Sequence, residues 1–246
     1  MPIIGGEQHQ LTGSTFGFSA VGLNDLDESE YTLVTLVQDE SSSVDQFVSE
    51  MEHCLGSAVE ACTHSPRANN LLLRVVAFNH GFREVHGFKE LKDCNPGDYQ
   101  GALNPNGMTA LYDATENAIE ATLAFGGKAD AADIDANGLV IIITDGCDNR
   151  STSTLNSLEK LLQNVRRDES LQSLNVIVVG VNVQDSMVSN MLEQLKDVTG
   201  ADQYLELKDA SAKTLAKLAQ FVSRSISSVS QSLASGQAPN LGSLSI

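Results

Sequence analysis

The chain has 246 residues and a formal net charge of −17, and its residues are 41% hydrophobic but only 5% aromatic, with no tryptophan. This composition is typical of a globular protein with a mainly aliphatic core, and no segment reaches the roughly 20 apolar residues of a membrane-spanning helix. The negative charge argues against nucleic acid and anionic membranes as partners, because phosphate groups are bound by clustered lysine and arginine.

The predicted elements begin with a polar, glycine-rich segment. Residues 1–30 carry only scattered apolar side chains, so we expect an N-terminal arm that lies on the domain or adds a short strand. From Tyr31 onward, near-continuous apolar runs rich in Val, Ile and Leu predict buried parallel strands. These runs cover residues 31–37, 71–78, 139–143 and 174–181. Weaker patterns predict a strand within 80–90 that pairs antiparallel at one edge of the sheet, and a second edge strand at 203–207.

Between these strands, apolar residues spaced by about 3.6 positions predict helices. The helical segments are 44–62, 109–125, 155–165, 187–198 and 213–229. Strands that alternate with helices of this length indicate βαβ units. We therefore expect one α/β domain at residues 31–229, Rossmann-like, with a doubly wound, mostly parallel central sheet flanked by helices. The Ser-, Gly- and Ala-rich residues 230–246 are predicted to form a flexible tail.

Three segments combine oxygen-bearing side chains with positions at predicted strand ends or helix starts. They are Asp39-Glu-Ser41-Ser-Ser43, Asn106-Gly-Met-Thr109-Ala-Leu-Tyr-Asp113 and Ile141-Ile-Ile-Thr-Asp145-Gly-Cys-Asp148. In an open α/β sheet, ligands bind at the carboxyl ends of the strands. A hard divalent cation such as Mg²⁺ binds about six oxygens at about 2.0–2.1 Å and usually keeps several waters. The sequence therefore predicts a metal site that leaves one coordination position open.

Taken together, the three segments resemble the metal-ion-dependent adhesion site (MIDAS) of von Willebrand factor A (VWA) domains. The matching residues are Asp-x-Ser-x-Ser at 39–43, Gly-x-Thr-x-Leu-Tyr-Asp-Ala at 107–114 and Thr-Asp-Gly at 144–146. Their order and spacing fit the family over roughly residues 31–228, which is nearly the whole chain outside its two ends. The resemblance implies a VWA fold.

The resemblance also implies a role for each candidate ligand. Ser41 and Ser43 would bind the ion directly through their hydroxyls, and Thr109 would bind it directly or through water. Asp39 and Asp145 would act mainly through water. Mg²⁺ is the expected ion, with Mn²⁺ and Ca²⁺ as alternatives. An ion with few directly bound carboxylates stays electrophilic, so the expected partner is a protein that offers an Asp or Glu carboxylate.

Each part of this pattern also has a simpler explanation. Ser41 and Ser43 stand just before a predicted helix, and serine is a favoured N-cap residue. Thr109 could cap the next helix in the same way, and Asp145-Gly146 could be an ordinary turn. Only their joint occurrence favours the metal site.

Residues beside the candidate ligands are expected on the rim of a partner-binding surface. They are Glu40, Met108 and Asp148. For the two acids, a solvent-exposed charge without a binding role is the simpler interpretation, and for Met108 the simpler interpretation is packing.

Two other functions would fit parts of this pattern. A metal-dependent phosphatase of the haloacid dehalogenase type also begins with a strand that ends in a metal-binding Asp, but it needs a second Asp two residues later as general acid. Here that position is Ser41. We therefore expect no enzymatic activity. The other alternative is a scaffold in which the metal is purely structural and partners use another face.

Two features bear on the compartment. The N-terminal MPIIGGEQHQ has neither the basic nor the apolar region of a signal peptide. The four cysteines, at 54, 62, 94 and 147, form no CxxC pair, so we expect free thiols in a reducing compartment. These features predict a cytoplasmic protein. The resemblance to bacterial cytosolic VWA members implies a role as an adaptor or regulator in a multi-protein system.

Overall fold

The computed structural model describes residues 6–11, 17–165 and 170–241, and within them the chain forms an eight-stranded sheet of order β1-β2-β5-β4-β3-β6-β7-β8. The strands are β1 (Glu7–Gln10), β2 (Gly17–Ala20), β3 (Glu30–Asp39), β4 (Leu71–Phe78), β5 (Phe82–Glu90), β6 (Asp135–Thr144), β7 (Leu174–Gly180) and β8 (Gln203–Glu206). Strands β4, β3, β6, β7 and β8 are parallel to one another, and β5 is antiparallel to β4.

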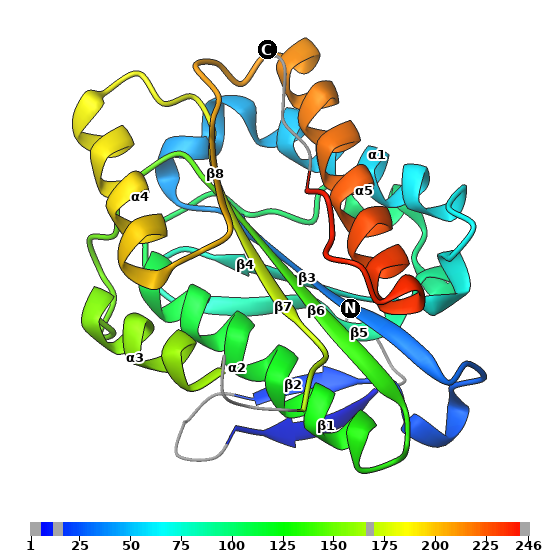
Figure 1. The fold of residues 1–246 in the computed structure, drawn as a ribbon. Helices are drawn as coiled ribbons and strands as arrows, with labels where there is room; N and C mark the ends of the chain where they lie inside the picture. The colour runs from blue at the N-terminus through cyan, green and yellow to red at the C-terminus, as the bar shows by residue number, and fades with distance from the viewer. Residues whose placement is uncertain (1–5, 12–16, 166–169, 242–246) are drawn as a thin grey trace.

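Helices cover both faces of this sheet (Figure 1). Helices α1 (Val48–Thr63) and α5 (Ala212–Ser235) pack on one face, where they share a hydrophobic core with the sheet. Helices α2 (Leu111–Asp130), α3 (Leu155–Val165) and α4 (Ser186–Thr199) pack on the other. This arrangement confirms the predicted α/β fold with a mostly parallel central sheet.

The central strands show why their sequences are almost continuously apolar. Nine of the ten residues of β3 are buried, and so are all eight residues of β4. Alternate side chains of β3 point to opposite faces, so that Leu36 packs in the core with α1 and α5 while Val37 packs with the helices of the other face. A strand covered on both faces therefore needs apolar residues at successive positions.

Several helix boundaries differ from the predicted ones. A 3-10 helix, η2 (Ser42–Phe47), precedes α1, so the α-helix begins at Val48 rather than at residue 44. Helix α2 begins at Leu111 and continues to Asp130, five residues beyond its predicted end at 125. The continuation is buried at Gly126 and Ala129, where the small side chains make the apolar face hard to see in the sequence.

The predicted N-terminal arm contributes two strands to the sheet. Strand β1 pairs antiparallel with β2, and β2 pairs in parallel with β5 at a single register position, Ala20 with Phe88. As a result β5, which was expected at an edge, has neighbours on both sides. Buried side chains from β2, β5 and α2 pack together beneath this hairpin, among them Phe18, Phe88 and Phe125. Residues 1–5 and 12–16 of the arm lie outside the described residues.

The C-terminal helix runs past the boundary at 229 that was predicted for the tail. Helix α5 ends at Ser235, and Ser230 is fully buried. The Ser230 hydroxyl accepts a hydrogen bond from Arg67 Nε at 3.0 Å. Beyond the helix, Leu241 packs against the core, and residues 242–246 of the predicted tail lie outside the described residues. A serine-rich segment usually indicates disorder. In α5 the small side chain of a buried serine such as Ser230 instead allows close packing on the domain.

Among the described residues, the structure contains no helix that is both long and apolar enough to cross a membrane.

The contact between the hairpin and β5 yields a stability prediction. A Cβ atom at Gly87 would lie 2.0 Å from the Ser19 carbonyl oxygen, so Gly87→Ala must push β2 away from β5. We expect a loss of about 1–3 kcal/mol, as for other overpacked sites, and a melting temperature lower by several degrees in a thermal scan. At Gly81 a Cβ would meet nothing within 4 Å, so Gly81→Ala is the matched control. Equal melting temperatures for the two variants would contradict the prediction.

Candidate functional site

Two of the three candidate ligand segments, those that follow β3 and β6, lie next to each other in the structure. These neighbouring parallel strands pair up to Gln38 and Ile143, which brings Asp39 and Thr144 side by side at the carboxyl edge of the sheet. The Thr144 hydroxyl donates to Asp39 Oδ2 at 2.5 Å. Asp39 Oδ1 accepts from the backbone N–H of Ser41 at 2.7 Å. Asp39 is fully buried, so its carboxylate acts from behind the loop and holds Ser41 in place.

Beyond Asp39, three side-chain oxygens form a continuous chain. Ser41 Oγ lies 3.0 Å from Ser43 Oγ, and Ser43 Oγ lies 2.7 Å from Asp145 Oδ1. Oxygens at neighbouring corners of an octahedron with metal–oxygen distances of about 2.0–2.1 Å lie about 2.8–3.0 Å apart. The Ser41–Ser43 spacing is close to such an octahedral edge, so these two hydroxyls fit a small divalent cation, and the Asp145 carboxylate accepts a hydrogen bond from Ser43 beside them.

The helix-cap explanation for these residues does not match the geometry. Ser41 occupies the N-cap position of η2, yet its side chain makes no cap hydrogen bond. Helix α2 likewise has Ala110, not Thr109, at its N-cap. Its first free N–H groups are satisfied from another loop, because Tyr112 N donates to Asp148 Oδ1 at 3.2 Å and Asp113 N donates to Ser151 Oγ at 3.0 Å. The hydroxyls of Ser41 and Thr109 are therefore not used as caps.

Thr109 reaches the site by a route that the sequence did not indicate. Its loop does not follow a strand directly. It comes after β5, the 3-10 helices η4 (Leu91–Asp93) and η5 (Pro96–Tyr99), and a long connection back to the carboxyl edge. There Thr109 N donates to Asn149 Oδ1 at 2.9 Å, and Asn149 N donates to the Thr109 carbonyl at 3.0 Å. This reciprocal pair ties the Thr109 loop to the loop of Asp145.

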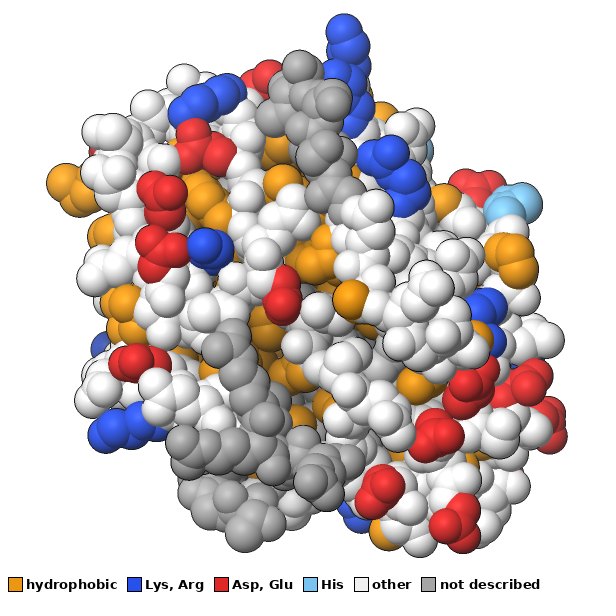
Figure 2. All heavy atoms as spheres, in the orientation of Figure 1, with side chains coloured by type: hydrophobic (Ala, Val, Ile, Leu, Met, Phe, Trp, Pro, Cys, Tyr) orange, Lys and Arg blue, Asp and Glu red, His pale blue; other side chains and the backbone are white. Residues whose placement is uncertain are grey.

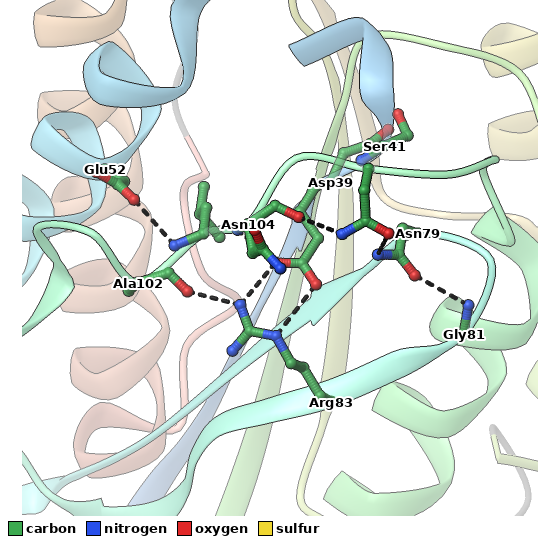
Figure 3. A network of polar contacts seen from close by, with 11 residues as sticks. Asp39, Ser41, Glu52, Asn79, Gly81, Arg83, Ala102 and Asn104 are labelled. Carbon is green, nitrogen blue, oxygen red and sulfur yellow. Dashed lines mark hydrogen bonds and ion pairs between the residues drawn. The ribbon is translucent and has the colours of Figure 1, made fainter. Parts of the chain in front are cut away.

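The end of β4 supports the same loop. Ala110 N donates to the Asn79 carbonyl at 2.6 Å, and Asn79 Nδ2 donates to Asn106 Oδ1 at 3.3 Å (Figure 3). Together with the contacts of Thr109, these bonds fix the loop from two sides. Thr109 itself is 4% exposed, so it sits inside the edge rather than on its surface.

The residues expected on the rim divide into three kinds of environment. Met108 is 50% exposed, as a rim position requires. Asp148 is half-buried, and it accepts hydrogen bonds from Tyr112 N and, at 2.5 Å, from the Ser151 hydroxyl. Glu40 differs from the prediction of an exposed rim charge, since it is only 3% exposed and is paired with Arg83. Its carboxylate points away from the Ser41–Ser43 side of the loop and is not available to a partner.

The two acidic side chains of the site carry perturbed pKa values. Burial raises the pKa of the Asp39 carboxyl above its ordinary value, and the hydrogen bonds from Thr144 and Ser41 oppose this change. Burial also raises the pKa of Asp145 to about 6; the hydrogen bond from Ser43 lowers it, and the nearby charge of Asp39 raises it further. Both causes that raise the pKa penalise the ionised form, and a bound cation would relieve that penalty.

The chemistry available at this edge is therefore oxygen coordination of a hard cation. The donors are hydroxyls and carboxylates, which favour ions such as Mg²⁺, Mn²⁺ or Ca²⁺. No cluster of three or more His, Cys, Asp or Glu side chains suited to a metal occurs in the described part of the chain. All four cysteines are free, and Cys54, Cys62 and Cys94 are buried away from the surface.

Three residues shape the site in ways that the sequence did not predict. Thr144 holds Asp39, Asn149 holds Thr109, and Arg83 pairs with Glu40. Thr144 was recognised as part of the Thr-Asp-Gly motif, but without a role of its own. No local signal marks Asn149 or Arg83, since each acts on a residue about 40 positions away along the chain.

Comparisons with known proteins show the fold. No protein-family model and no curated protein match this sequence. Among solved structures, the PilB minor pilin from Streptococcus sanguinis matches with a TM-score of 0.58 and 14% identity over 86% of this chain and 64% of PilB. The pilus adhesin SpaC from Lactobacillus rhamnosus GG matches with a TM-score of 0.55 and 13% identity, over 82% of this chain and 30% of SpaC.

A third match is proximal thread matrix protein 1 (PTMP1) from the mussel byssus, in a structure with a zinc-occupied MIDAS motif. Its TM-score is 0.50, with 20% identity over 85% of this chain and 47% of PTMP1. The chain thus spans less than two thirds of each of these proteins. At such low identities the matches show a VWA-like α/β fold and nothing further about this chain.

The raised pKa of Asp145 predicts how stability depends on pH without metal. Its pKa is about 6 in the folded protein against an ordinary 3.8, so between these values the folded state binds more protons and stability falls as pH rises. In EDTA, we expect the melting temperature to fall by a few degrees as the pH rises from about 5 to about 7, since 1 kcal/mol corresponds to about 2–4 °C in a chain of this size.

The Asp145→Asn variant isolates this contribution from those of other groups. It removes the titrating carboxyl, so its melting temperature should depend less on pH than that of the wild type. An equally steep decline in the variant would show that Asp145 does not titrate in this range.

Proposed function

We propose that this chain is a divalent-metal-dependent protein-binding module. Ser41, Ser43 and Thr109 would hold the ion, and Asp39 and Asp145 would support it mainly through water. The observation that carries the proposal is the 3.0 Å spacing of the Ser41 and Ser43 hydroxyl oxygens, which is close to an octahedral edge, with the Asp145 carboxylate bonded to Ser43 beside them. These groups lie at the sheet edge where ligands of open α/β folds bind.

The proposed metal ligands are mainly neutral, which supports binding of an acidic residue from a partner. Asp39 is buried and already accepts hydrogen bonds on both oxygens, so it supplies negative charge without being a free ligand. The direct donors would be mainly neutral hydroxyls. Such an ion keeps its positive character and accepts an Asp or Glu carboxylate from a partner protein as a further ligand.

The surface charge limits what kind of partner can approach. The chain carries a net charge of −17, and the acidic side chains that gather at the lower right of Figure 2 lie at the end of the sheet where β3 begins in Figure 1, away from the candidate site. Exposed charges act over about one Debye length, about 8–10 Å at moderate salt. A partner that presents one carboxylate within a neutral or basic surface would therefore bind better than a generally acidic one. Met108, exposed next to Thr109, offers an apolar contact at the same place.

Within this proposal, Mg²⁺ is the expected ion, with Mn²⁺ and Ca²⁺ as alternatives. The chain would act as an adaptor or regulator in a multi-protein system rather than as an enzyme. A cytoplasmic setting, as in bacterial cytosolic VWA proteins, belongs to the same proposal.

Substitutions within the Asp-x-Ser-x-Ser loop test the metal site. Ser43→Ala removes an oxygen that contacts both Ser41 and Asp145, so we expect Mg²⁺ affinity to fall about tenfold or more, that is by about 1.4 kcal/mol or more. Ser42→Ala, at an exposed position in the same loop, is the matched control and should bind Mg²⁺ like the wild type. Isothermal titration calorimetry measures both. A wild-type protein that binds no divalent ion would contradict the proposal.

The same variants separate protein binding from the two alternative functions. Once a partner is identified, binding should be lost in EDTA and in Ser43→Ala but retained in Ser42→Ala. If EDTA lowers the melting temperature while the complex stays intact, the metal is structural. If the protein hydrolyses a generic phosphate ester with Mg²⁺, and Asp39→Asn abolishes this activity, the chain is a phosphatase instead.

A further inference from the structure

Glu40 lies between two residues of the candidate metal site, Asp39 and Ser41, but its side chain faces a different neighbour. Arg83 of β5 grips its carboxylate with two nitrogens, since Nε donates to Oε1 at 3.1 Å and Nη2 donates to Oε2 at 2.6 Å (Figure 3). The Glu40 side chain is 4% exposed, whereas that of Arg83 is 43% exposed. Two parallel hydrogen bonds fix orientation as well as distance, which a single contact would not do.

This ion pair also binds the loop that carries Thr109. Arg83 Nη2 donates to the Ala102 carbonyl at 2.6 Å, and Asn104 N donates to Glu40 Oε2 at 2.9 Å (Figure 3). The main chain continues the connection, because Asn106 N donates to the Glu40 carbonyl at 2.9 Å. Glu40 is therefore attached to this loop through both its side chain and its backbone.

One more contact links this tether to the candidate ligands. Ser42 N donates to the Gly107 carbonyl at 3.2 Å, so the Ser41–Ser43 segment and the Thr109 loop lie side by side. Their relative position determines whether three hydroxyls from two loops can reach one ion. In the described part of the chain, the ion pair that joins these two loops is that of Arg83 and Glu40.

We infer that the Arg83–Glu40 ion pair is a positioning device for the metal site. It holds the Ser41–Ser43 segment and the Thr109 loop in the relative arrangement that metal binding requires. Arg83 and Glu40 touch no ion in this scheme and act only through the loops that they join. The inference rests on the proposed function, because it assigns these two residues a role toward the same ion.

A second ion pair, at the opposite end of β3, provides a comparison. Arg67 Nη2 lies 2.6 Å from Glu30 Oε1, the same separation as in the Arg83–Glu40 pair. Glu30 is the first residue of β3, at the opposite end of the strand from Asp39. Loss of either pair should reduce stability, but only loss of the pair near Asp39 should alter the metal site.

The experiment compares Arg83→Met with Arg67→Met. For each variant, Mg²⁺ affinity is measured by isothermal titration calorimetry and the melting temperature is measured in EDTA. We expect both variants to melt at lower temperature than the wild type. Mg²⁺ affinity should fall about tenfold in Arg83→Met, a typical effect of removing a support for metal ligands, and should stay at the wild-type value in Arg67→Met.

Further variants keep the test valid if Arg83→Met does not fold. Arg83→Lys keeps the charge but loses the two-nitrogen grip, so its affinity should lie between those of the wild type and Arg83→Met. In Glu40→Gln/Arg83→Met, no buried charge is left unpaired, so stability should partly return. Mg²⁺ affinity should remain low in this double variant, because the Arg83 link between Glu40 and the Ala102 carbonyl is still missing.

The outcomes distinguish this inference from the function on which it rests. If the wild type binds no Mg²⁺, both fail. If the wild type binds Mg²⁺ and Arg83→Met binds it equally well, the proposed function stands and the positioning role is wrong. The positioning role is also wrong if the affinity of Glu40→Gln/Arg83→Met recovers together with its melting temperature, since the effect was then one of stability alone.

Discussion

The buried carboxylate of Asp39 is the constraint on which the rest of the site depends. A carboxylate with no exposure to solvent must be stabilised by hydrogen bonds, and here Thr144 Oγ1 and Ser41 N supply them. The first bond joins the ends of β3 and β6, and the second bends the chain so that Ser41 begins a new loop. The geometry of the Ser41–Ser43 segment therefore follows from how the protein satisfies one buried charge.

Element bounds were predicted best from the sequence where both faces of the element are buried. Strand β4 was predicted with its observed bounds because all eight residues are buried, which leaves a continuous apolar run. The end of α5 was not found, because Ser225 and Ser230 are buried although serine usually signals an exposed or disordered segment. Here the local composition was misleading, and tertiary packing decided the structure.

The candidate site could be predicted only as far as its residues lie at local chain features. Asp39 and Asp145 follow apolar strands, so the sequence pointed to both, and the structure brings their loops together through Ser43. Glu40 was expected on the rim because an acid in a polar loop is usually solvated. Its partner Arg83 lies 43 residues further along the chain. Arg83 reaches the carboxyl edge of the sheet because β5 is antiparallel to β4 and starts where β4 ends.

The pairing of Glu40 also fits the charge balance that the proposed function requires. With Glu40 neutralised by Arg83, the acids that face the proposed ion are Asp39 and Asp145, whose two negative charges match those of a divalent cation. In the proposed scheme, Arg83 would thus act electrostatically as well as geometrically, because a neutralised Glu40 would leave the ion able to attract an acidic residue of a partner although this chain carries a net charge of −17.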